Sequence, residues 1–219
     1  MNSDVFLQRE MPHGQCVILR FGDGIDWSTH LTEAEAVFAE MLPLLRRHSF
    51  TAGRAALRMA LRMAGTESGD LLPTERGGPN VQTGFSGSIS HKDGLAAALA
   101  TKGTQSTCGV DLEVVRAKRP DISRHVLTRE ELDADRELPA EERMRVLLLR
   151  FSLKEAIYKA IDPFVQRYVG FKEVRVTPQE LGAADVEMLL PESDPELVVD
   201  AHWERFGEFI LATARAERV

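Results

Sequence analysis

The chain has 219 residues, of which 43% are hydrophobic and 28% are charged, and its net charge is −7. This length suits one compact unit, and the composition excludes an intrinsically disordered chain. The negative charge argues against a general nucleic-acid binder, which would need a broad basic surface. No run approaches the ~20 apolar residues of a membrane span, and Cys16 and Cys108 are too few for a disulfide framework. We therefore expect a cytoplasmic protein that binds neither nucleic acid nor membrane.

The predicted elements of the first half follow one another closely. In chain order they are a strand at 17–21, a helix after Thr32, a helix at 44–63, a loop at 65–87 and a strand at 95–100. Thr32-x-x-Glu35 matches a capping box and so marks a helix start, and Pro43 interrupts that helix. Apolar residues at helical spacing support the second helix, which Gly65 stops. A glycine-rich loop of this length inside a compact protein is often functional.

The second half is predicted to hold a strand, a long helix and three more strands. They lie at 108–115, 141–161, 174–177, 198–203 and 209–214, with an acidic helix and loop at 129–142. On the first strand apolar residues alternate with Asp111 and Glu113, so both carboxylates point to one face. A buried apolar stripe supports the long helix, and Pro163 is expected to close it.

This order of elements predicts the fold class. No sequence repeat is evident, yet the two halves are similar, since each holds a long helix and strands that follow it. We expect an α+β fold with halves at 1–105 and 106–219, in which each long helix packs on a small antiparallel sheet.

The acidic residues of the second half predict a metal site. Two carboxylates side by side on one strand, Asp111 and Glu113, repel unless a cation lies between them. Magnesium prefers carboxylate oxygens together with waters and phosphates, and Glu155 on the long helix is the candidate third ligand. Two alternatives exist for Glu155. It could pair with Lys159 on the helix surface, or it could belong to a capping box, Ser152-x-x-Glu155, which requires a helix to begin at Ser152.

Positive and hydroxyl groups near these acids suit a phosphate. Lys154 and Lys159 would stabilise negative charge that develops during a phosphoryl transfer, although lysine is also a common surface residue. Ser90 and His91 follow the glycine-rich loop, where a hydroxyl, an imidazole and backbone N–H groups could hold an anion. A lone histidine is more often structural. Because no acid partner or G-x-S-x-G elbow accompanies Ser90, a serine hydrolase is disfavoured.

An arginine stripe marks the helix at 44–63. Arg54, Arg58 and Arg62 are four residues apart on one face. Like charges at this spacing repel one another, so the stripe does not stabilise the helix itself. It is either a solvated face or an anion-binding one.

Together these segments resemble the 4′-phosphopantetheinyl transferases, in particular the larger, two-halved type associated with siderophore, polyketide, nonribosomal peptide and fatty-acid synthesis. The matching segments cover roughly residues 45 to 175. They are Phe50-Thr51-Ala52-Gly53-Arg54, Glu75-Arg76-Gly77-Gly78-Pro79, Gly87-Ser88-Ile89-Ser90-His91, Gly109-Val110-Asp111-Leu112-Glu113 and Phe151-Ser152-Leu153-Lys154-Glu155-Ala156-Ile157-Tyr158-Lys159-Ala160. Phe151 stands where Trp is also familiar, and Arg76 stands where Lys is familiar, which would change how a phosphate is held.

The resemblance implies a pseudo-symmetric fold with coenzyme A and magnesium in the cleft between the halves. Asp111, Glu113 and Glu155 would bind the metal, and Glu155 would help to take the proton of the attacking serine. Lys154 and His91 would contact the coenzyme A phosphates, with Lys159 as a supporting cation. The nucleotide end with its 3′-phosphate would meet three side chains, those of Arg54, Arg76 and Ser90. Catalysis would thus rest on Glu155, Lys154 and Asp111.

The implied reaction transfers the phosphopantetheine arm of coenzyme A to a serine of an apo acyl, peptidyl or aryl carrier protein and releases 3′,5′-ADP. A monomer is expected, because one chain holds both halves. Candidate carrier-docking residues, weighed equally against an ordinary surface, are Arg116, Lys118, Arg119, Arg124, Phe164, Arg167, Tyr168 and Phe171. Two rivals are a magnesium-dependent hydrolase of the coenzyme A pyrophosphate and a catalytically silent module that binds coenzyme A or a carrier.

Overall fold

The structure, a computed structural model, describes residues 4–115 and 120–219. Its first half forms a four-stranded antiparallel sheet in the order β1-β2-β4-β3. The elements of this half are β1 (Val5–Met11), β2 (Gly14–Arg20), α1 (Glu33–Glu40), α2 (Leu44–Met63), β3 (Phe85–Lys92) and β4 (Leu95–Lys102). The capping box at Thr32 and the bounds of the helix at 44–63 are confirmed. The sequence prediction missed β1, an edge strand whose alternation is broken by exposed Arg9 and Glu10.

The second half forms a five-stranded antiparallel sheet in the order β5-β9-β8-β7-β6. Its elements are β5 (Ser106–Val114), α3 (Ser123–Val126), α4 (Arg129–Ala134), α5 (Ala140–Val165), β6 (Val174–Pro178), β7 (Ala183–Met188), β8 (Leu197–Phe206) and β9 (Phe209–Arg218). The expectation that Pro163 closes the long helix was wrong. A proline in the last turn removes only one hydrogen bond, so α5 runs to Val165 and ends at Gln166, whose φ is 54°. The prediction also missed β7.

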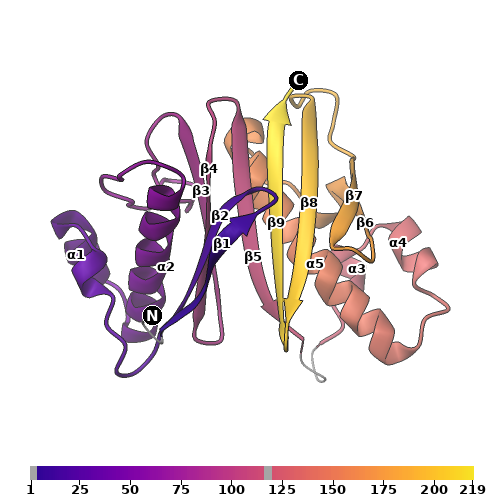
Figure 1. The fold of residues 1–219 in the computed structure, drawn as a ribbon. Helices are drawn as coiled ribbons and strands as arrows, with labels where there is room; N and C mark the ends of the chain where they lie inside the picture. The colour runs from indigo at the N-terminus through magenta and orange to yellow at the C-terminus, as the bar shows by residue number, and fades with distance from the viewer. Residues whose placement is uncertain (1–3, 116–119) are drawn as a thin grey trace.

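The elements form four layers, in which a helix covers the outer face of each sheet and the two inner faces pack together (Figure 1). α2 packs on β2 and β4 through small and branched apolar residues, and α5 packs on β8 and β9 in the same manner. Between the sheets lie Cys16, Ile18, Leu99, Val110 and Leu211. The α+β fold is therefore confirmed.

The chain changes from one sheet to the other between Lys102 and Ser106. The division at residues 105 and 106 into two halves stays a prediction. No helix in the described part of the chain combines the length and the apolar character that a membrane span requires.

The two sheets meet at the edge strands β3 and β5, where serine side chains replace a backbone ladder. The hydroxyl of Ser86 accepts from the N–H of Cys108 at 3.0 Å, and that of Ser88 accepts from Val110 N–H at 3.0 Å. These contacts satisfy backbone donors on β5 that have no strand partner on this side. They also fix β3 beside β5, so that Ser90 and His91 of the first half come close to the acids of the second.

Candidate functional site

A cavity of about 780 Å³ lies where α5, β3 and the loop after α2 meet. Both halves of the chain line it. Its lining includes Arg54, Arg76, His91, Glu155, Lys159 and Asp162. A smaller cavity of about 200 Å³ lies on the other side of Glu155 and Tyr158 and is lined by Lys154, Tyr168 and Phe171. Glu155 and Tyr158 line both cavities, so they stand at the boundary between them.

Asp111 is the centre of the polar contacts beside the larger cavity. Its carboxylate accepts from the hydroxyls of Ser90 and Ser152, each at 2.9 Å, and from the ammonium of Lys159 at 3.0 Å. Lys159 also donates to the carbonyl of Val110 at 2.8 Å. Strand β3, strand β5 and helix α5 are thus tied together at one nearly buried carboxylate.

Ser152 has a role that the sequence prediction did not give it. Helix α5 begins at Ala140, so Ser152 lies in its interior, and the capping box with Glu155 was wrong. The fully buried hydroxyl of Ser152 instead fixes one oxygen of Asp111. The alternative surface pair was also wrong, since no ion pair in residues 4–115 and 120–219 joins Glu155 to Lys159, whose ammonium bonds to Asp111.

The remaining two acids differ in how their charge is balanced. Glu113 is nearly buried and pairs with Lys92, whose ammonium lies 3.0 Å from one carboxylate oxygen. The prediction missed Lys92, because its partner is on a neighbouring strand. Burial raises the pKa of Glu155, Lys159 lowers it, and the charges of Asp111 and Glu113 raise it further. A carboxyl group with a raised pKa beside two other carboxylates is suited to hold a proton or to share a cation.

The donor chemistry of these three acids fits a hard divalent cation. All three supply carboxylate oxygens, which magnesium prefers. A cation would relieve the repulsion from Asp111 and Glu113, which adds to the effect of burial in raising the pKa of Glu155. In the described ranges no three histidine, cysteine or acidic side chains converge closely enough to hold a metal ion. Lys92 and Lys159 supply the nearby positive charge. The magnesium site stays a prediction.

The position of Lys154 differs from what its sequence context predicts. Only 2% of the residue is exposed, and its ammonium donates to Glu131 at 2.6 Å and to the carbonyls of Val126 and Phe171 at 2.9 and 3.0 Å. All three donors are therefore used within the protein. The expectation of a direct phosphate contact is corrected accordingly, because Lys154 joins α5 to α4 and does not line the larger cavity. Glu131 was missed by the sequence prediction.

The residues expected at the nucleotide end all come to this region, and each of them already has a hydrogen-bond partner within the protein. Arg76 pairs with Asp162 of α5 and donates to the carbonyl of Arg167 at 3.1 Å. Ser90 donates to Asp111. His91 lines the cavity, and its pKa is lowered by partial desolvation of the imidazole and by the nearby cations Lys159 and Arg46.

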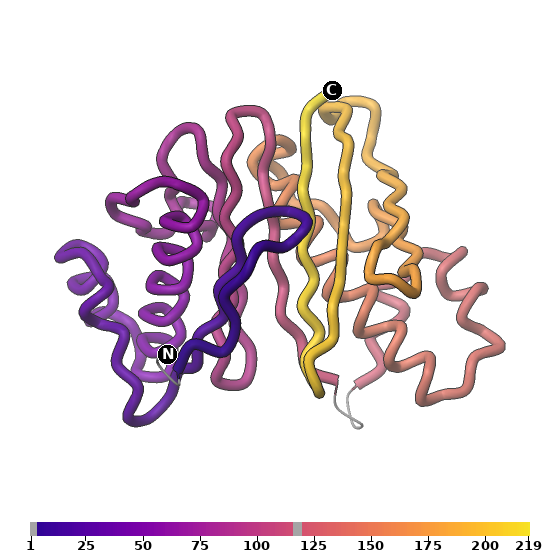
Figure 2. The backbone as a smooth tube through the Cα atoms, viewed as in Figure 1, coloured from indigo at the N-terminus to yellow at the C-terminus, as the bar shows by residue number. Residues whose placement is uncertain are grey.

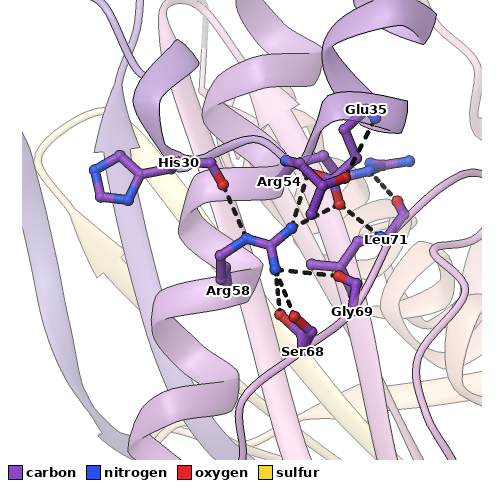
Figure 3. A network of polar contacts seen from close by, with 8 residues as sticks. His30, Glu35, Arg54, Arg58, Ser68, Gly69 and Leu71 are labelled. Carbon is purple, nitrogen blue, oxygen red and sulfur yellow. Dashed lines mark hydrogen bonds and ion pairs between the residues drawn. The ribbon is translucent and has the colours of Figure 1, made fainter.

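Arg54 is 7% exposed, and its Nε donates to the carbonyl of Leu71 at 2.5 Å. Burial lowers its pKa to about 10, so it stays charged at pH 7. Figure 3 shows that Arg54 lies beside Arg58, whose guanidinium bonds to Glu35. The interpretation of the arginine stripe as a solvated face is therefore wrong for Arg58, which is buried and pairs with Glu35. Arg62 is exposed and pairs with Glu67.

The candidate docking residues scatter over several environments. Arg116, Lys118 and Arg119 lie outside the described residues. Arg124 and Tyr168 are exposed, Phe164 is half-buried, and Phe171 packs on Phe151 with 5.5 Å between ring centroids. Arg167 already pairs with Glu173 and Asp194, so its charge is neutralised.

Known proteins share this sequence pattern. Residues 33–101 match the 4′-phosphopantetheinyl transferase N-terminal domain, and residues 107–214 match the 4′-phosphopantetheinyl transferase superfamily. The 4′-phosphopantetheinyl transferase Npt of Nocardia iowensis is 32% identical over 182 residues, which cover 76% of this chain and 80% of Npt. The chain belongs to the 4′-phosphopantetheinyl transferase superfamily.

Two further known proteins are similar to this chain, one in sequence and one in structure. The 4′-phosphopantetheinyl transferase Svp of Streptomyces mobaraensis is 31% identical over 153 residues, covering 67% of this chain and 61% of Svp. A crystal structure of a holo-(acyl-carrier-protein) synthase from Bacillus anthracis in complex with CoA (3′,5′-ADP) has 20% sequence identity and a TM-score of 0.42. That similarity covers 51% of this chain and 96% of the synthase.

Proposed function

We propose that this transferase moves the phosphopantetheine arm of coenzyme A to a serine of an apo carrier protein in a magnesium-dependent reaction. The observation that carries the proposal is a single cavity lined by Glu155, Lys159, Arg54 and His91, beside which Asp111 accepts from the ammonium of Lys159. The lining thus combines a carboxylate, which can hold a cation or take a proton, with cationic and imidazole side chains that can bind phosphates. This combination matches a substrate that carries a reactive pyrophosphate and a 3′-phosphate.

In the proposed reaction the carrier serine oxygen attacks the β-phosphorus of coenzyme A. A new P–O bond forms to the serine, the bond to the leaving 3′,5′-ADP breaks, and the serine proton passes to a carboxylate. Glu155 is the proposed acceptor, because its raised pKa and its position at the cavity suit general-base catalysis. Lys159 is placed to offset charge on the phosphates, while Ser90 and Ser152 hold the carboxylate of Asp111 in one orientation.

Asp111, Glu113 and Glu155 are the residues that would hold magnesium. When bound, the cation would supply positive charge to the pyrophosphate and so favour displacement at phosphorus. The protein side chains orient the substrate: Arg54 would bind its nucleotide end, and His91 would contact its phosphates. We assign Lys154 to the support of helix α5, since its ammonium is fully used by internal acceptors.

The test is transfer to apo-carrier proteins, followed by mass spectrometry. Incubation with coenzyme A and magnesium should add roughly 340 Da, the mass of the transferred group, and a chelator should abolish the reaction. A panel of acyl, peptidyl and aryl carriers identifies the acceptor class. Release of 3′,5′-ADP without a carrier would favour the pyrophosphate hydrolase, and binding of coenzyme A without any turnover would favour the silent module.

A further inference from the structure

A polar network recurs in the two halves with the same spacing along the chain. In each half a threonine caps a short helix, and the glutamate three residues later bonds to a cation of the long helix. The glutamate and the cation are 23 residues apart in both halves, and an arginine lies one helical turn before the cation. The corresponding residues are Thr32, Glu35, Arg54 and Arg58 in the first half and Thr128, Glu131, Arg150 and Lys154 in the second.

In the first half the network fixes the backbone of one residue, Leu71, in the loop after α2. The carboxylate of Glu35 is fully buried and accepts from Arg58 at 2.7 Å and from the N–H of Leu71 at 2.6 Å. The carbonyl of Leu71 in turn accepts from Nε of Arg54 (Figure 3). Arg58 also donates to the carbonyls of Ser68 and Gly69, so the whole loop segment is tied to α2.

The second half repeats these contacts on strand β6. Glu131 accepts from Lys154 at 2.6 Å and from the N–H of Val176 at 2.9 Å. The carbonyl of Val176 accepts from Nε of Arg150 at 3.2 Å. Each buried glutamate therefore holds the N–H of a residue whose carbonyl accepts from an arginine of the long helix. Contacts that occur in both halves serve the fold that the halves share. A contact that differs between the two halves therefore indicates a role other than the support of the fold.

The two arginines differ in their partners. Arg150 forms an ion pair with Asp135, so its charge is neutralised inside the protein. In the first half, the position that corresponds to Asp135 is occupied by Ala39, which carries no charge. No ion pair in residues 4–115 and 120–219 joins Arg54 to an acid. Its guanidinium lies over the ring of Phe50, 4.3 Å from the centroid, and lines the 780 Å³ cavity. Glu35 acts on this guanidinium only at longer range. A nearly buried guanidinium at a cavity, with no ion-pair partner in the described residues, favours an anionic ligand.

We propose that Glu35 is a positioning residue for the nucleotide end of coenzyme A, acting on Arg54 through the backbone of Leu71. Arg58 donates to both oxygens of the buried Glu35 carboxylate, and the Leu71 carbonyl occupies Nε of Arg54. The terminal nitrogens of Arg54 are thereby left for the 3′-phosphate. This inference rests on the proposed function, because it takes coenzyme A as the substrate.

The experiment compares coenzyme A with dephospho-coenzyme A, which lacks the 3′-phosphate. Glu35→Gln should raise KM for coenzyme A about tenfold, the size of one charge-assisted hydrogen bond, and leave KM for dephospho-coenzyme A and kcat nearly unchanged. Glu35→Asp keeps the charge beside Arg58 but shortens the reach to Leu71, so it should show the same selective loss in a stably folded protein. In an Arg54→Ala background, either change should have no further effect on the KM ratio.

Glu131→Gln is the matched control, since it makes the same change in the other copy. It should lower the melting temperature without changing the ratio of the two KM values. Equal weakening of both substrates by the Glu35 variants would overturn the proposal, as would a wild-type enzyme that binds both substrates equally. Calorimetric binding of the same two ligands separates this outcome from failure of the proposed function, because it needs no transfer to a carrier.

Discussion

At the scale of single residues, the site depends on carboxylates whose surroundings differ. Asp111 is held by two hydroxyls and an ammonium, and Glu113 pairs with Lys92. Glu155 has the raised pKa, which burial causes and its acidic neighbours increase. Groups with different surroundings divide the work of a site, and Glu155 is the one suited to exchange a proton.

Replacing Glu155 with Gln preserves its shape and removes its charge. Turnover is expected to fall by about 10²–10⁴-fold, the usual contribution of a positioned acid or base. The melting temperature should stay near that of the wild type, because no cap or ion pair of Glu155 supports α5 in the described residues. Transfer rates and thermal melts measure the two effects. Near-normal turnover in the folded variant would remove Glu155 from the site.

The sequence could predict the placement of Asp111 and Glu113 because both belong to one strand with a simple period of two. It could not predict their partners. Ser152 lies 41 positions from Asp111, and Ser90 lies 21 positions away, so only the packing of α5 and β3 against β5 brings them together. Lys154 was assigned to the wrong environment for a related reason. Its neighbour Glu155 faces the cavity, but adjacent residues on a helix point in different directions.

At the scale of elements, the contact of α5 with β5 depends on a glycine. A Cβ at Gly109 would lie 1.9 Å from the carbonyl oxygen of Ala156, which is far closer than atoms can approach. Gly109→Ala should therefore destabilise the fold by at least about 3 kcal/mol and lower the melting temperature by about 6–12 °C. Gly69→Ala is the control, because nothing lies within 4 Å of the position that its added methyl group would take. Equal melting temperatures for the two variants would contradict this account of the packing.

The buried pair of Lys154 and Glu131 gives a second prediction for α5. Lys154→Met leaves an uncompensated carboxylate in the interior, which should cost about 3–5 kcal/mol of unfolding free energy. The double variant Lys154→Met with Glu131→Gln removes both charges and should recover part of that loss. Urea unfolding measures both. A Lys154→Met protein as stable as the wild type would instead favour a phosphate-binding role for this lysine.

The elements themselves show where sequence patterns are sufficient. The helix at 44–63 was predicted with its observed bounds, because Pro43 precedes it and its apolar spacing is regular. The capping box of Thr128 and Glu131 has the same pattern as that of Thr32 and Glu35, yet it lay unrecognised within an acidic stretch. That second box would have revealed the internal repeat. The partners of the two glutamates, in contrast, follow from tertiary packing.

At the scale of the whole molecule, the β1–β2 hairpin joins the two halves. The hairpin starts in the first sheet and reaches over the strands at the C-terminal end of the chain (Figure 2). Arg9 pairs with Glu204 of β8 and lies over the ring of Phe206, and Phe6 meets the same ring edge-on with 6.5 Å between centroids. Because the proposed site also needs both halves, contacts that hold them together support its geometry.

His13, at the tip of this hairpin, makes the junction sensitive to pH. Its Nδ1 lies 2.8 Å from the hydroxyl of Thr213, and its Nε2 lies 3.3 Å from a carboxylate oxygen of Asp200. Burial lowers the pKa of His13 below its usual 6.5, although Asp200 acts in the opposite direction. The unfolded chain therefore binds this proton more readily, and acid favours unfolding.

The free energy of unfolding should thus fall as the pH drops below about 6.5, with up to about 1.4 kcal/mol lost per pH unit from this proton until the folded pKa is reached. Above that range both states hold His13 neutral, so it adds no pH dependence. His13→Asn should flatten the profile, whereas His125→Asn, at an exposed position, is the control. The difference between wild type and variant isolates His13, because His91 also has a lowered pKa. Urea unfolding from pH 5 to 8 measures the free energy of unfolding of each variant. If this free energy changes with pH in the same way for wild type and His13→Asn, His13 does not determine the stability of the protein in acid.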